Sequence, residues 1–400
     1  MTALAEVQFR EGREEEAEKT LRAALEGQRR VLGPDDNDTL SSMNRLGVAL
    51  AALGGFEEAE RLQREALAGQ TRSLGPEHPE TLRIMGNLAL TLWKAGKLAD
   101  AEALGREVST LARRALGPDH PVTINATNNL AAVLNNEGRH DEAEALQRHN
   151  LEDYRRVLGA EHPQTLRAMN NLGITLYSQG KLAESEKLLA DLLAIRRRIL
   201  GPSHPDTLVV MSNLAFTLAD AGRFAESEAL ARGAFETRKR VLGSEHPSTL
   251  RSMSQLANAL DRQGLLAQAE ELFRDVLAAR RRVLGRKHRD TLDSITELAR
   301  AIDAAGRHEE ARTLLDEALS LGSALPPGDP AVATMRHALA CNAALLGRRS
   351  EALALLREAV GHGLPGELGR GLSKDAALTT LRGDPAFESL AREAAQASGR

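Results

Sequence analysis

Apolar residues recur along the chain at spacings of three and four, which is the spacing of one face of an α-helix. In one stretch these positions are Leu166, Met169, Leu172, Gly173 and Leu176. The same pattern returns 42 residues later. Directly after the first stretch, Gly180 separates it from a second helical stretch, which begins with acidic residues and ends on Arg196–Arg198. Acidic side chains at the start and basic ones at the end of a helix both complement its dipole. The pattern therefore predicts a hairpin of two helices.

This hairpin repeats with a constant period. Leu-Gly pairs end at Gly33, Gly75, Gly117, Gly159, Gly201, Gly243 and Gly285, so each step is 42 residues. Since a single hairpin cannot bury its apolar stripe alone, stacked neighbours must supply the rest of the core. We expect an all-α solenoid of helix hairpins that winds into a right-handed superhelix.

The phase of the repeat also predicts the domain boundaries. Residues 1–38 form a partial N-terminal repeat, and residues 39–320 form seven 42-residue repeats. A divergent last repeat follows at 321–360, where ALPPGDP replaces the usual LGPxHP loop. Residues 361–400 are expected to be a Gly-rich linker and C-terminal capping helices.

Composition narrows the classes of function. Lys and Arg number 52 against 56 Asp and Glu, a net charge of −4, so nucleic acid is not an expected partner. The single cysteine, Cys341, cannot form an intrachain disulfide or a thiolate zinc cluster, which fits a reducing compartment. No apolar run approaches the roughly 18–20 residues of a membrane span. We expect a cytoplasmic protein without catalytic residues, cofactor or metal, whose oligomeric state the sequence leaves open.

Histidines precede a proline, or Arg289 in one case, at the start of successive repeats. They are His78, His120, His162, His204, His246 and His288. Packed helices lie about 8–10 Å apart, too far for equivalent histidines to share a metal ion. We expect each ring instead to accept a hydrogen bond from an unpaired backbone N–H at a helix start.

The repeat resembles a known family. Leu130, Ala131, Gly138 and Ala143 match the packing signature of the 42-residue tetratricopeptide repeats found in kinesin light chain and in bacterial multi-repeat proteins. The tail, with LRGDPAFESL, resembles the last repeat and cap of bacterial arrays, some of which follow serine/threonine kinase domains. The kinase signature motifs are absent from this sequence.

In that family the first helix of each repeat lines a concave groove, and the resemblance implies the same here. Asparagine is a poor former of helix interiors, yet five of them share one face of a single first helix. Amides match the N–H and C=O groups of an extended peptide, and two rare aromatics lie on equivalent positions. The candidate groove residues are Arg83, Asn87, Trp93, Asn125, Asn128, Asn129, Asn135, Asn136, Arg167, Asn170, Asn171, Tyr177, Asn213 and Arg251.

Several features have a second interpretation. Asn87, Asn129, Asn171 and Asn213 could bridge neighbouring helices instead of binding a ligand. Basic runs such as Arg196–Arg198 could form a phosphate-binding ridge, against the simpler account of dipole compensation.

A short glycine motif also has two interpretations, a dinucleotide-binding site and a linker. Gly361, Gly363 and Gly366 spell G-x-G-x-x-G but lack the preceding strand of a dinucleotide site, so we interpret them as linker.

These observations favour a scaffold or adaptor that binds a protein or an extended peptide segment in the groove of a tetratricopeptide solenoid. The alternative is a regulatory or sensor portion of a signalling protein, linked to a kinase or nucleotide switch and separated from its effector domain.

Overall fold

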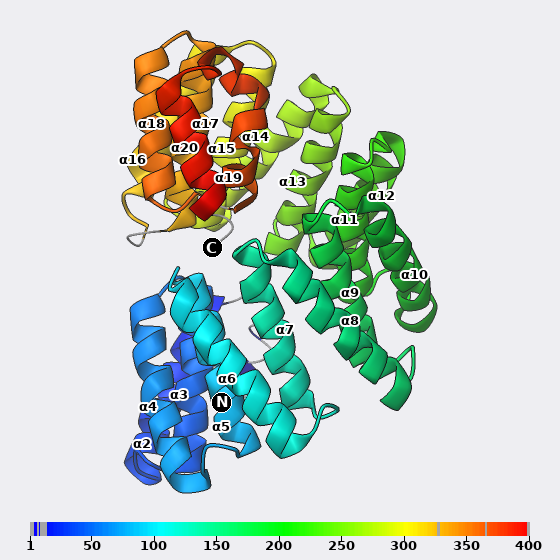
Figure 1. Ribbon diagram of the computed structural model, residues 1–400, viewed down its shortest axis with the longest axis vertical. Helices are drawn as coiled ribbons and strands as arrows, with labels where there is room; N and C mark the ends of the chain where they lie inside the picture. Colours follow the sequence, from blue (N-terminus) through cyan, green and yellow to red (C-terminus); the bar gives the residue numbers. More distant parts are fainter. Residues whose placement is uncertain (1–3, 6–7, 9–13, 326–328, 365, 398–400) are drawn as a thin grey trace. The chain divides into compact units, whose positions relative to one another are not determined.

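The computed structural model describes residues 4–5, 8, 14–325, 329–364 and 366–397. The chain is divided into two compact units, which we describe separately. The N-terminal unit comprises Met1–Asn135 and His140–Asn171, and the C-terminal unit comprises Asn136–Arg139 and Leu172–Arg400. Both consist of helices that follow one another in hairpins (Figure 1), as the sequence predicts.

In the N-terminal unit, the first helices of the repeats alternate with the second helices. The first helices are α3 (Asn37–Ala52), α5 (Pro79–Lys94), α7 (Pro121–Asn136) and α9 (Pro163–Ser178), whose last residues belong to the other unit. The second helices are α2 (Glu14–Val31), α4 (Phe56–Leu74), α6 (Leu98–Leu116) and α8 (His140–Val157).

The C-terminal unit continues this alternation. Its first helices are α11 (Pro205–Asp220), α13 (Pro247–Arg262), α15 (Arg289–Ala304) and α17 (Pro330–Leu345). Its second helices are α10 (Leu182–Leu200), α12 (Phe224–Leu242), α14 (Leu266–Val283), α16 (His308–Gly322) and α18 (Arg349–Gly361). The remaining elements are α19 (Gly366–Gly371), the 3-10 helices η1 (Leu372–Lys374) and η2 (Ala376–Leu381), and α20 (Pro385–Ala397).

The loop before each first helix is fixed by side-chain hydrogen bonds. Nδ1 of each of the six loop histidines accepts from the backbone N–H two residues later, at 3.1–3.2 Å. The predicted capping role is therefore confirmed. Asp36 and Asp329 do the same before α3 and α17, with N···O distances of 2.9 Å. A threonine hydroxyl then closes the loop, as where Thr81 donates to the Gly75 carbonyl at 2.8 Å.

The apolar stripe predicted for the first helices forms the core. Met85, Met169 and Met211 are buried, and Met253 is partly buried against the same kind of cluster. Small residues let the two helices of a hairpin approach closely. A Cβ atom at Gly173 of α9 would lie only 2.7 Å from a methyl carbon of Leu189 in α10. Helix spacing in this hairpin thus depends on that glycine.

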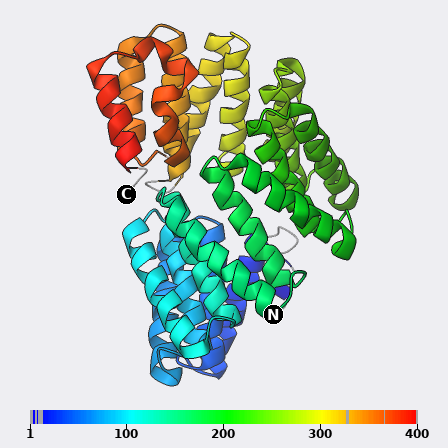
Figure 2. The ribbon, with the colours of Figure 1, turned by 45° about the vertical axis from the view of Figure 1, so that its right-hand side comes forward.

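The C-terminal segment packs over the last hairpin. Leu372, Leu378, Leu381, Phe387 and Leu390 form one buried cluster with apolar residues of α17 and α18. Figure 2 shows these C-terminal helices, in orange and red, gathered in one group. One expectation needs correction, because the segment predicted as Gly-rich linker contains the short helix α19.

Candidate functional site

Neighbouring first helices contact one another directly inside each unit, as α3 does α5 and α11 does α13. They carry a face that is only partly buried. It is formed by the positions equivalent to 83, 87, 90 and 94, which follow the spacing of one helix face. We call this surface the inner face.

Two of the predicted asparagines bridge first helices of the N-terminal unit. Asn87 Nδ2 in α5 donates to Asn44 Oδ1 in α3 at 3.3 Å. Asn129 Nδ2 in α7 donates to the backbone carbonyl of Gly86 in α5 at 3.4 Å. The amides at this position therefore hold the stack together, and that role uses part of their hydrogen-bonding capacity.

The other asparagines of α7 differ in environment. Asn125 is exposed. Asn128 is half-buried, and its Oδ1 is shielded from solvent without a partner among the described residues. Asn135 Oδ1 lies 3.1 Å from Nδ1 of His140, at the start of α8. The side chain of Asn136 lies outside the described part of the chain.

The remaining predicted residues of the N-terminal unit lie on α5 and α9. Trp93 is half-buried and packs on the apolar cluster of Leu88, Leu92, Ala101 and Val133. Arg83 forms an ion pair with Glu80, Arg167 is exposed, and Asn170 and Asn171 are half-buried.

In the C-terminal unit, polar groups connect three first helices. Tyr177 of α9 donates its hydroxyl hydrogen to Asp220 Oδ2 of α11 at 2.6 Å. Asp220 also forms an ion pair with Arg262 of α13. Asn213 is half-buried on α11, and Arg251 is exposed on α13. Tyr177 thus has a structural partner on the inner face.

The structure also reveals an apolar column that the sequence analysis did not single out. It consists of Val48, Leu90 and Ala132 in the N-terminal unit and of Ile174 and Phe216 in the C-terminal unit, at positions that recur every 42 residues. Val48 and Ile174 both have 41% of their surface exposed, although neither is at a helix end. The constant spacing of this column is visible in the sequence, but the sequence analysis assigned the binding groove to the asparagines beside it.

A small hollow lies on the inner face of the C-terminal unit. Its lining comprises Ser212, Ala215, Phe216, Ala219, Ser227, Gln255, Asn258, Ala259 and Arg262. Phe216 supplies an apolar wall, while Gln255, Asn258 and Arg262 supply polar groups. The hollow's volume of about 10 Å³ is that of about one water site, so the hollow itself does not take a side chain.

The inner face becomes acidic toward α15. Asp293 and Glu297 occupy the positions held by Arg251 and Gln255 one repeat earlier. Burial raises the pKa of Asp293 to about 7, with Arg289 opposing and Asp290 and Glu297 adding to the shift. Burial likewise raises the pKa of Glu297, whose Oε1 accepts from Asn258 Nδ2 at 3.3 Å.

The hypothesis of a basic, phosphate-binding ridge is wrong for the first arginine of three of the basic runs. Arg196, Arg238 and Arg280 are buried. Arg196 and Arg280 each donate from Nη1 to a backbone carbonyl at the start of the next first helix, at 2.7 and 2.9 Å. These arginines join consecutive helices and do not present their charge to a partner.

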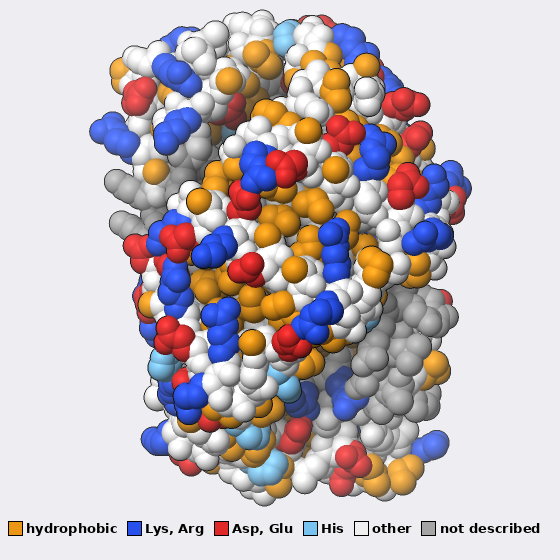
Figure 3. Space-filling model, turned by 90° about the vertical axis from the view of Figure 1, so that its right-hand side faces the viewer, with side chains coloured by type: hydrophobic (Ala, Val, Ile, Leu, Met, Phe, Trp, Pro, Cys, Tyr) orange, Lys and Arg blue, Asp and Glu red, His pale blue; other side chains and the backbone are white. Residues whose placement is uncertain are grey.

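The outer arginines are largely matched by acids of neighbouring repeats. Arg282 pairs with Glu245 and Arg281 with Glu317, both in the C-terminal unit. On the face seen in Figure 3, basic and acidic side chains are interspersed. The pairing of Arg281 and Arg282 with acids gives little support to a phosphate-binding ridge.

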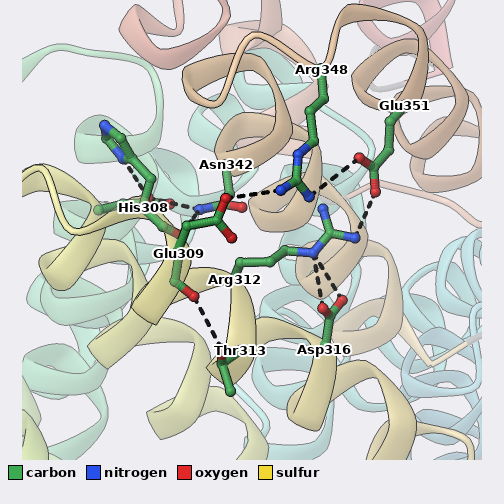
Figure 4. A network of polar contacts seen from close by, with 9 residues as sticks. His308, Glu309, Arg312, Thr313, Asp316, Asn342, Arg348 and Glu351 are labelled. Atoms are coloured by element: carbon green, nitrogen blue, oxygen red, sulfur yellow. Dashed lines mark hydrogen bonds and ion pairs between the residues drawn. The ribbon is translucent and has the colours of Figure 1, made fainter.

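The last hairpins show how such contacts link repeats. Figure 4 shows Arg312 of α16 between Asp316 on its own helix and Glu351 of α18, at 3.0 and 2.6 Å. Arg348 reaches back to Glu309 at 2.9 Å. Surface pairs of this kind are individually weak, so each adds little to stability.

Comparison with known proteins identifies the repeat. The family model of the tetratricopeptide repeat matches this chain at residues 1–72, 41–114, 122–198, 175–232, 206–282, 252–321 and 290–361. The chain belongs to the tetratricopeptide repeat family. Repeats of this family generally act as protein-binding scaffolds, and no catalytic domain is identified in this tetratricopeptide chain. No curated protein matches it significantly in sequence.

Solved structures extend the comparison. The crystal structure of "Podosopora anserina putative kinesin light chain nearly identical TPR-like repeats" is 30% identical to this chain in sequence. The match covers 51% of this chain and 97% of that one, with a TM-score of 0.45. BtubC (BKLC) from P. vanneervenii is 23% identical over 57% of this chain and 92% of its own, at a TM-score of 0.48. A Rap protein complexed with Competence and Sporulation Factor is 12% identical over 89% and 99%, with a TM-score of 0.54, and shares the fold.

The described helices of this tetratricopeptide chain include none that is both long enough and apolar enough to cross a membrane.

Proposed function

We propose that this chain is a scaffold or adaptor that binds an extended segment of a protein partner along its inner face. The observation that carries the proposal is that amides occupy the inner-face position three residues before the apolar column. They are Asn87, Asn129 and Asn171 in the N-terminal unit and Asn213 and, at the equivalent position of the next repeat, Gln255 in the C-terminal unit. In the C-terminal unit, Phe216 of the apolar column lines the same hollow as Gln255. Side chains of an extended strand alternate between two sides, so such a segment can set apolar groups on one column while its backbone meets the amides.

Two further facts support a binding role. A partly exposed column of apolar side chains costs solvation free energy in the free protein, and covering it recovers that energy. The Rap protein, which shares this fold, is complexed with Competence and Sporulation Factor. A cytoplasmic setting fits the single cysteine of the chain.

The proposal can be tested with a peptide library displayed on phage and selected on the intact chain. We expect enriched peptides to be unstructured alone and to carry apolar residues at alternate positions. Their affinity is then measured by fluorescence anisotropy for the intact chain and for Phe216→Asp. We expect the substitution to weaken binding at least about tenfold, as for an interface anchor worth roughly 2 kcal/mol.

The matched control is Val241→Asp on α12. Val241 is 56% exposed and lies outside the inner face, so the same chemical change should leave affinity unaltered. If Phe216→Asp bound like the unaltered chain while Val241→Asp bound poorly, the ligand would lie on the second helices instead.

A further inference from the structure

A cluster of three metal-ligating side chains lies where α17 meets the C-terminal segment. His337 and Cys341 are one helical turn apart on α17, and Asp375 precedes η2. His337 Nε2 lies 3.5 Å from Asp375 Oδ2 and 3.7 Å from Cys341 Sγ. Cys341 Sγ lies 3.6 Å from the same Asp375 oxygen. Three different donor atoms thus converge on one point.

The arrangement does not suit a cysteine–histidine–aspartate catalytic relay. In such a relay one ring nitrogen faces the nucleophile and the other faces the carboxylate. Here the single atom Nε2 faces both the thiol and the carboxylate. A histidine in this orientation cannot pass a proton from the thiol toward the carboxylate through its ring.

The distances do suit a tetrahedral metal ion. Bonds of about 2.0–2.3 Å from zinc to nitrogen, oxygen and sulfur place neighbouring donors about 3.3–3.6 Å apart at a tetrahedral angle. The observed separations of 3.5 and 3.6 Å fall at the upper end of this range, and the 3.7 Å between Nε2 and Sγ lies just above it. We propose that His337, Cys341 and Asp375 bind one zinc-class divalent ion, with water as the fourth ligand.

The surroundings supply the required protonation states and access. His337 is buried, and burial lowers its pKa against the opposing charge of Asp375, so the ring stays neutral with a lone pair to offer. Burial and the Asp375 charge raise the pKa of the Cys341 thiol, so metal binding must release its proton to solvent. The thiolate and carboxylate then neutralise the ion, and the half-exposed Asp375 leaves a path for its entry.

The local geometry leaves Asp375 able to serve two purposes. Its Oδ1 caps η2 by accepting from the Ala377 N–H at 2.9 Å, while Oδ2 faces the histidine and the thiol. A bound ion would therefore join α17 to the segment that packs over it. The mixture of sulfur, nitrogen and oxygen donors favours zinc or cobalt over calcium or magnesium, which prefer oxygen alone.

The test uses the full chain, stripped of metal with a chelator and titrated with Co²⁺ and then Zn²⁺. Because Cys341 is the only cysteine, a thiolate-to-cobalt charge-transfer band can arise from this site alone. We expect that band to appear and saturate at one ion per chain, and zinc to abolish it and raise the melting temperature. Exposed loop histidines that capture metal weakly would give no such band.

Two variants assign the ligands, each checked for unchanged helical circular dichroism. Cys341→Ser should abolish the band, and Asp375→Asn, which can still cap η2, should weaken zinc binding at least about tenfold. Asp36→Asn, which changes a cap far along the sequence, should bind zinc like the unaltered chain. Absence of the band in the folded unaltered chain, or equal zinc affinity in Asp375→Asn, would overturn the proposed site.

Discussion

At the scale of single residues, the loop histidines act as helix caps whose role depends on one ring nitrogen. Nδ1 accepts from a backbone N–H, so the hydrogen of the neutral ring must lie on Nε2. Asp36 and Asp329 replace histidine at this position in the first and last repeats. The chain thus contains its own evidence that a carboxylate can take over the cap.

This comparison leads to a stability prediction for His204. Replacing it with alanine should lower the free energy of unfolding by about 0.5–2 kcal/mol, because the Asp206 N–H loses its partner. His204→Asp should retain most of that stability, since aspartate caps well. Urea unfolding of the two variants checks the order, and equal losses would show that the ring acts by packing instead.

A partly buried acid provides a second prediction at this scale. The pKa of Asp293 is raised to about 7 in the folded chain, above the value of about 3.9 expected when unfolded. Between these values the folded state binds more protons, so stability should fall as the pH rises from about 4 to about 7. Asp293→Asn should remove this part of the pH dependence in denaturant titrations.

The comparison variant for Asp293 is Asp275→Asn, which changes an exposed acid on α14. It should leave the slope of stability against pH unaltered. If both variants gave the slope of the unaltered chain, burial of Asp293 would not be coupled to folding.

The sequence predicted residue roles well where a local spacing encodes them. A histidine before a helix start specifies its cap, and the methionine stripe specifies the core. It could not show which arginine of a triplet turns inward, because Arg196, Arg197 and Arg198 all end the same helix. Only packing against the next first helix buries Arg196 and leaves Arg197 exposed.

At the scale of elements, the repeat period fixed every hairpin from α3 to α16, since 42-residue steps specify where each helix begins. The same period contains the apolar column of the inner face, although the asparagines dominated the interpretation. The repeat period could not predict contacts between residues far apart in the sequence, such as that between Cys341 and Asp375, which are 34 residues apart. The short helix α19 was missed because glycines there suggested coil.

The C-terminal segment provides a prediction at this scale. Ending the chain after Gly361 should expose the side of α17 and α18 that Phe387 and Leu390 now cover. We expect the truncated protein to stay helical but to self-associate, because an uncovered apolar flank is an association site. Light scattering against concentration measures this. A monomeric truncation would show that the segment does not cap the stack.

A less severe change serves as its control. Arg392→Ala alters an exposed residue of α20 whose side chain reaches only its own helix in the contacts described, through the Glu388 carbonyl. It leaves the apolar cover intact, so this variant should scatter light like the unaltered chain.

At the scale of the whole molecule, the contacts of each repeat are mainly with its neighbours in sequence. Consecutive helices such as α11, α12 and α13 pack in order, and consecutive helices of the N-terminal unit, such as α3, α4 and α5, do the same. Stability in such an array is approximately a sum over repeats and their interfaces. The chain should therefore tolerate removal of a complete period better than removal of part of one.

The last prediction tests this additivity in the C-terminal unit. Deleting residues 207–248 removes one full period and joins Asp206 to Thr249, which restores the loop sequence His-Pro-Asp-Thr-Leu. We expect a soluble protein that unfolds cooperatively and loses about a tenth of its helical circular dichroism signal, in proportion to 42 of 400 residues. Deleting only 207–227 is the matched control, because it removes nearly all of α11 with the first turn of α12 and sets two second helices in succession. That half-period variant should aggregate, since the faces brought together no longer match. Equal behaviour of the two deletions would mean that the repeats do not fold as interchangeable units.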